Sequence, residues 1–152
     1  MKRRFDMKNQ QMNAKALKFK SYLDGNNLAY FHCNELGDDA HTVIFQSQIP
    51  VNDIYLPVGI ITDDTIYTII RVQIAEKVVS QGIQSKLEEY INVLNRNYKV
   101  FKYMITEDGS IFLDACLPSS QECFDAEVVR AVLDVIIDHL QKEYISLMNQ
   151  MK

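Results

Sequence analysis

The strongest constraint on this fold is a pair of strand-like segments joined by an Asp-Gly dipeptide. Residues 98–106 and 110–117 both alternate in the manner of β-strands, and they flank Glu107, Asp108 and Gly109. An Asp-Gly pair supplies the positive φ angles that a tight hairpin requires, and Pro118 ends the second segment because it lacks a backbone N–H. We therefore predict an antiparallel hairpin over residues 98–117.

The predicted hairpin is apolar on both of its faces. The face expected to lie under helices carries Phe101, Tyr103, Ile105, Ile111, Leu113, Ala115 and Leu117. An antiparallel sheet with one covered face normally has a polar second face. Here the second face is apolar as well, so it needs a cover: a second copy, another protein, or this chain's own segment 50–57. The predicted dimer or partner interface consists of Tyr67, Ile69, Tyr98, Val100, Met104 and Phe112, with Cys116 on the same face.

Three segments show the apolar spacing of amphipathic helices. The first should end at Asp24-Gly25, the second near residues 95–97, and the third should run from the cap Asp125 to about Met148. The second begins at Ser80 or at Ser85, which could form a capping box with Glu88. Their apolar positions are Met12, Ala16, Phe19 and Leu23; Ile83, Leu87, Ile91 and Leu94; and Val128, Val132, Ile136, Leu140 and Leu147.

The other strands are predicted at residues 29–34, 43–49 and 65–75, the last having the strongest β-branched content. Pro50 and Pro57 favour a loop or sheet edge between them, followed by a short strand at 58–62. The resulting order is α-β-β-β-α-β-β-α, with the third strand continuous or split. This order predicts a single α+β domain over residues 1–152, a two-layer sandwich of an antiparallel sheet packed against helices.

Charge is distributed unevenly. The chain has 16 basic and 20 acidic residues, but residues 1–20 hold seven of the basic ones and a single acid, Asp6. The remaining nine basic and nineteen acidic residues give a net charge of −10. We expect residues 1–12 to form a flexible basic arm. Attachment to nucleic acid or to an anionic membrane is the alternative, although no aromatic or Gly-rich nucleic-acid motif accompanies the arm, so nucleic acid is not the expected partner.

The three cysteines, and the lack of a sequence typical of a membrane helix or a signal peptide, predict a cytoplasmic protein. The number of cysteines is odd and there is no CxxC pair, so we expect Cys33, Cys116 and Cys123 to be reduced thiols. We expect Cys33 and Cys116 to be small apolar fillers of the core. No stretch approaches the ~20 apolar residues of a membrane helix. The basic start of the chain is not followed by the apolar region of a signal peptide.

Motifs for catalysis or cofactor binding are absent from the sequence. The five glycines are never closer than twelve residues, which excludes glycine-rich phosphate loops. His139 and Glu143 stand one helical turn apart, but two ligands do not make a zinc site, and we expect a histidine paired with that carboxylate. The acidic pairs at 38–39, 63–64 and 107–108 fit turns. We predict that the protein binds no metal or cofactor and is not an enzyme. The alternative is an enzyme whose unrecognised active site is built from residues such as His139, Glu143 and Cys116.

The second half of the chain resembles the YbjN-like family. The resemblance covers residues 94–97, the hairpin around Glu107-Asp108-Gly109, the strand ended by Pro118, and the capped helix that ends in Glu143-Tyr144 and Leu147-Met148. Members are described as bacterial sensory transduction regulators, with a fold similar to type III secretion chaperones. The resemblance implies a non-catalytic, cytoplasmic protein-binding or chaperone-like module, homodimeric and with an unidentified protein partner. The segment 50–62 and the basic arm depart from the family pattern.

Overall fold

A computed structural model describes residues 12–152; the basic segment 1–11 lies outside this range. The predicted α+β class is confirmed, and four strands separate the first two helices, which corresponds to the split alternative for the third strand. The elements in chain order are α1 (Ala14–Gly25), β1 (His32–Glu35), β2 (Val43–Val51), β3 (Ile54–Thr62), β4 (Tyr67–Ala75), α2 (Gln81–Asn97), β5 (Lys102–Ile105), β6 (Ile111–Pro118) and α3 (Ala126–Asn149).

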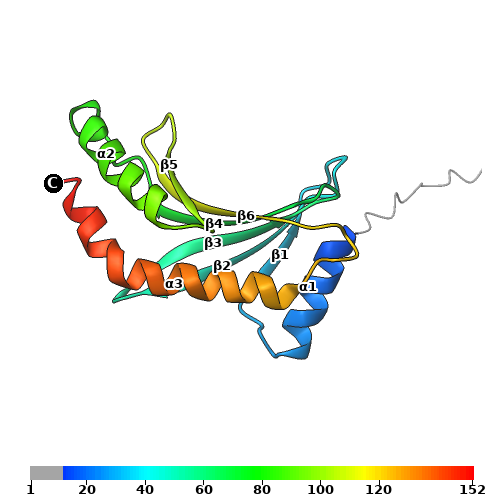
Figure 1. Ribbon diagram of the computed structural model, residues 1–152. Helices are drawn as coiled ribbons and strands as arrows, with labels where there is room; N and C mark the ends of the chain where they lie inside the picture. Colours follow the sequence, from blue (N-terminus) through cyan, green and yellow to red (C-terminus); the bar gives the residue numbers. More distant parts are fainter. Residues whose placement is uncertain (1–11) are drawn as a thin grey trace, which may run out of the picture.

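The six strands form one antiparallel sheet in the order β1-β2-β3-β4-β6-β5. Figure 1 shows α3 crossing the sheet, with α1 near one end of α3 and α2 near the other. Alternate residues of the strands, such as Phe45, Ile60, Ile70 and Leu113, are buried under these helices. The core therefore lies between one face of the sheet and the helices, as the two-layer prediction requires.

The two prolines do not produce a loop. β2 and β3 form a long hairpin closed by residues 52 and 53, with Pro50 and Pro57 inside the strands. In a hairpin closed by two residues, alternate residues direct their N–H groups away from the partner strand, and both prolines occupy such outward positions. β1 pairs with β2 only as far as Gln46, and β4 pairs with β3 only from Val58. Neither proline therefore removes a ladder hydrogen bond. Of the two predicted alternatives, a loop or a sheet edge, the structure shows the sheet edge.

The third helix is capped and oriented largely as predicted. The Asp125 carboxylate accepts a hydrogen bond from the backbone N–H of Glu127 at 2.9 Å. Val128, predicted to be buried, is 48% exposed. The buried stripe instead contains Val129 and Ile136, two turns apart, and Val128 falls to one side of it. The buried residues of α3 are Val129, Ile136, His139, Leu140 and Leu147.

The basic residue Lys15 is buried despite its charge. Its side chain has no exposed surface, and Nζ donates to the carbonyl oxygen of Tyr67 at 2.5 Å, with an Asp63 oxygen 4.0 Å away. Burial lowers the pKa of this amine, and the nearby Asp63 opposes that shift. Lys15 thus ties the first turn of α1 to the start of β4.

The Asp-Gly hairpin gives the first testable prediction. Gly109 has φ +81°, and a Cβ there would lie 2.6 Å from the carbonyl oxygen of Val79. Gly109→Ala should lower the free energy of unfolding by about 1 to 3 kcal/mol or more, because it adds this clash to the cost of a left-handed residue. Urea unfolding measures the change. Gly25→Ala is the control, since its Cβ would meet no atom within 4 Å; equal effects of the two substitutions would contradict the prediction.

Candidate binding surfaces

The face of the sheet opposite the helices carries a row of apolar side chains across four strands. The strand registers align Ile44 of β2 with Ile61 of β3, then Ile69 of β4 and Cys116 of β6. The three isoleucines are half-buried and Cys116 is exposed. No helix among residues 12–152 lies over this row, because the helices occupy the other face. We call this surface, with Tyr67, Phe112 and Met104, the open face.

Four of the six predicted interface residues lie on the open face. Tyr67 and Met104 are 51% and 39% exposed, and Ile69 and Phe112 are half-buried. Met104 and Phe112 are directly opposite each other in the β5–β6 pairing. The predicted grouping is therefore present for these four, and whether they contact a partner stays a prediction.

The placement of Tyr98 and Val100 on that face is wrong. β5 begins only at Lys102, so the alternation of side chains between faces does not extend back to residue 98. The Tyr98 ring lies on the helix side instead, 5.2 Å from the ring of Phe101 and 4.3 Å from that of His139 between centroids. Val100 packs against the core.

An ion pair occupies the centre of the open face. The Arg71 guanidinium donates two hydrogen bonds to the Asp114 carboxylate, at 2.9 and 2.7 Å. These bonds raise the pKa of Arg71. The guanidinium carbon also lies 5.7 Å from the centre of the Phe112 ring. Sequence reasoning missed this pair, because the sequence does not show the register that sets Arg71 of β4 opposite Asp114 of β6.

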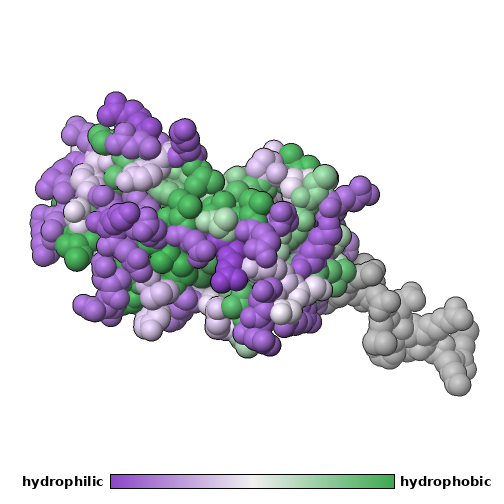
Figure 2. All heavy atoms as spheres, turned by 60° about the horizontal axis from the view of Figure 1, so that its bottom comes forward, coloured by the Kyte–Doolittle hydropathy of each residue, from purple (hydrophilic) through white to green (hydrophobic). Residues whose placement is uncertain are grey.

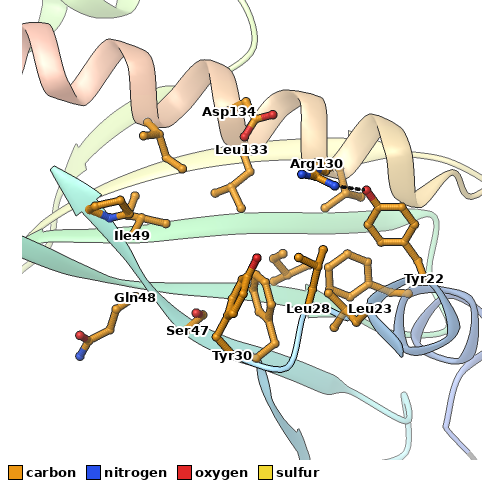
Figure 3. Close-up of a pocket in the computed structure, with 16 residues that line it drawn as sticks. Tyr22, Leu23, Leu28, Tyr30, Ser47, Gln48, Ile49, Arg130, Leu133 and Asp134 are labelled. Carbon is orange, nitrogen blue, oxygen red and sulfur yellow. Dashed lines mark hydrogen bonds between the residues drawn. The ribbon is translucent and has the colours of Figure 1, made fainter. Parts of the chain in front are cut away.

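A second surface, also missed by sequence reasoning, is an apolar groove on the helix side. It has a volume of about 300 Å³ and lies between α1, the end of β2 and the first half of α3. Figure 3 shows Leu23, Leu28, Ile49 and Leu133 around it, and Figure 2 shows hydrophobic residues between hydrophilic ones on this side of the molecule. At its rim, Arg130 donates to the Tyr22 hydroxyl at 3.1 Å, and Asp134 lies one turn further along α3.

The groove runs beside an uncovered edge of β2. β1 pairs with β2 only up to the pair His32–Gln46, although β2 continues to Val51. By the alternation of the β2–β3 hairpin, the backbone N–H and carbonyl of Gln48 face away from β3. Among the described residues no backbone hydrogen bond links Gln48 to the chain before β1. An extended segment in the groove would therefore find a free backbone donor and acceptor.

The expected pairing of His139 with Glu143 is wrong. His139 Nε2 lies 2.6 Å from the Tyr103 hydroxyl, whereas Glu143 accepts a hydrogen bond from Tyr90 of α2. Burial lowers the pKa of His139 and raises that of Tyr103. Burial and the hydrogen bond to Glu143 raise the pKa of Tyr90 to about 12. The two pairs join α3 to β5 and to α2, so they hold the helices in place.

The buried His139 predicts a pH dependence of stability. Its folded-state pKa lies below the unfolded value of about 6.5, so below that pH the unfolded chain binds more protons. Stability should therefore fall as the pH drops from 7.5 through 6.5 to 5. His139→Gln, which keeps a hydrogen-bonding group near Tyr103, should show a shallower fall in urea titrations. The exposed His41, whose pKa is raised by its hydrogen bond to Asp64, is present in both proteins and cancels in the comparison. Equal slopes would contradict the prediction.

The cysteines are not all core fillers. Cys33 is half-buried against the core, and burial raises the pKa of its thiol. Cys116, expected in the core, is exposed on the open face because it shares the face of Phe112 and Asp114 on β6. Cys123 is also exposed. Within residues 12–152, no three His, Cys, Asp or Glu side chains are grouped to hold a metal ion.

The acidic pairs serve turns, as predicted. Asp38 accepts hydrogen bonds from Thr42, Asp63 from Thr65, and Asp108 from Thr106 and Ser110. These local bonds lower the pKa of Asp38 and of Asp108.

Comparison with protein-family models, with curated proteins and with solved structures found no match to this chain. None of the helices within residues 12–152 has the length and hydropathy needed to span a membrane.

Proposed function

We propose that this protein is a non-catalytic, chaperone-like binding module whose open face pairs with a second copy of the chain. The observation that carries the proposal is the apolar row on the open face, where no helix of residues 12–152 lies above Ile44, Ile61 and Ile69. Apolar groups gathered on one surface are typical of protein interfaces. The resemblance to YbjN-like regulators and type III secretion chaperones supports the same class of function in the cytoplasm, with a further protein as the regulated partner.

The charges of the open face favour a second copy as the occupant. Arg71 and Asp114 lie side by side, and Lys102 is directly opposite Asp114 in the β5–β6 pairing. A two-fold interface brings the same patch of both subunits together, so a patch that contains both signs can complement itself. The apolar row on one side of these charges, with Phe112 and Met104 on the other side, supplies the area that would be removed from water.

The test is the variant Phe112→Lys, analysed by light scattering and circular dichroism. The wild type should be a dimer and the variant should shift toward monomer with an unchanged spectrum, because a free subunit leaves this half-buried position in contact with solvent. Ile145→Lys is the matched control: Ile145 is 62% exposed on α3 and should not affect association. A monomeric wild type would overturn the homodimer, and unfolding of Phe112→Lys would show that the face is internal.

A further inference from the structure

The helix-side groove is an exposed apolar surface that the proposed dimer leaves unused. It lies on the opposite side of the sheet from the open face, and its lining is dominated by residues such as Leu23, Leu28, Leu133 and Ile137. Such a surface normally contacts another segment of protein. The Gln48 backbone beside it offers hydrogen bonds to a segment in extended conformation.

The first eleven residues of the chain have the matching chemistry. In the sequence Met1-Lys-Arg-Arg-Phe-Asp-Met-Lys, the apolar residues Phe5 and Met7 alternate with Arg4, Asp6 and Lys8. In an extended segment, residues two apart point to the same side. Phe5 and Met7 would therefore face one surface together.

The charges are complementary as well. Residues 1–11 contain four basic side chains and one acidic one. On α3, Asp134 lines the groove and Glu127 lies beside it, next to the hydroxyl of the lining residue Tyr22; the two carboxylates flank Arg130, which is already bonded to Tyr22. These carboxylates can accept hydrogen bonds from Arg4 and Lys8, the basic residues that flank Phe5 and Met7 in the sequence.

The segment is also long enough to reach the groove. α1 lines the groove from Phe19 to Leu23, which is about 8 to 14 Å along the helix from Ala14 at 1.5 Å per residue. Met7 and Phe5 precede Met12 by five and seven residues, a reach of roughly 17 and 24 Å in extended conformation. Both side chains can therefore arrive at the groove while the chain stays connected to α1.

We propose that residues 1–11 of this chain occupy the helix-side groove, with Phe5 and Met7 against its apolar lining and the basic residues over Glu127 and Asp134. The groove is then a docking site for the chain's own basic segment. This proposal does not depend on the dimer at the open face, since the two surfaces share no residue.

The experiment uses full-length protein and a fluorescein-labelled synthetic peptide of residues 1–11, with binding followed by fluorescence anisotropy. The double variant Phe5→Ser/Met7→Ser should bind the peptide roughly tenfold more tightly than the wild type. In the wild type, the tethered residues 1–11 compete with the peptide for the groove at an effective concentration on the order of 1 mM. The double variant lacks the apolar side chains needed for this competition. Equal affinities, or no binding by the double variant, would overturn the proposal and leave the groove to another partner.

Two matched substitutions on α3 locate the binding site. Added to the double variant, Leu133→Arg should abolish peptide binding, whereas Val135→Arg should preserve it, because Val135 is 50% exposed and does not line the groove. If circular dichroism shows that Leu133→Arg is unfolded, the exposed Asp134→Lys takes its place and should weaken binding several-fold. Equal binding by the groove and control variants would overturn the assignment.

Discussion

A chain that ends at Ala131 should show no cooperative thermal transition. The truncation removes the last three quarters of α3, including the buried Ile136, Leu140 and Leu147, none of which has exposed surface. Each such side chain contributes on the order of 1.5 to 3 kcal/mol of burial, against a total stability of about 5 to 15 kcal/mol. The loss also uncovers the sheet residues beneath the helix.

Circular dichroism at 222 nm during a thermal scan measures this effect. The control is a chain that ends at Asn149, which lacks only the three residues after α3 and should melt cooperatively near the wild-type temperature. A cooperative transition in the chain that ends at Ala131 would show that the sheet and the other helices fold without α3, contrary to the architecture described above.

Ile60→Asp should strongly destabilise the protein, whereas Ile61→Asp should change its stability little. The two residues are neighbours on β3, but Ile60 is fully buried under the helices and Ile61 is half-buried on the open face. An unpaired carboxylate at residue 60 should cost about 3 to 5 kcal/mol or more. At residue 61 the carboxylate stays in contact with water, and a loss of about 1 kcal/mol or less is expected.

Urea unfolding of both variants measures the difference. A comparable loss of stability in both would show that the open face is covered within the folded subunit. In light scattering, Ile61→Asp should also weaken the dimer proposed above. An Ile60→Asp variant that loses about 1 kcal/mol or less would contradict the assignment of the core to the helix side of β3.

The local elements were predictable because their determinants lie close together in the sequence. The positive φ of Gly109, the cap at Asp125 and the stop after Gly25 each depend on a few neighbouring residues, and the structure confirms all three. Alternation within the hairpin also separated the buried Phe101 and Leu113 from Met104 and Phe112. Met104 and Phe112 were therefore predictable as neighbours on one face from the sequence alone.

The prediction failed where a local rule was extended past the element that justifies it. The prediction for Tyr98 requires the strand to include residue 98, but the strand begins at Lys102. The prolines of the β2–β3 hairpin favoured a loop because the sequence does not show which strand edges lie free. Their effect depends on where β1 and β4 stop pairing, which is a property of the whole sheet.

The tertiary structure alone decided which distant residues meet. The order β4-β6-β5 brings Arg71 to Asp114, and the packing of α3 brings His139 to Tyr103 instead of to Glu143 one turn away. Lys15 is buried because α1 crosses the start of β4, although its sequence position gives no sign of burial. The sequence determines local conformation and the apolar faces of each element, because these depend on neighbours within a few residues. The groove and the ion pair arise only when elements far apart in sequence pack together, since their walls belong to different elements.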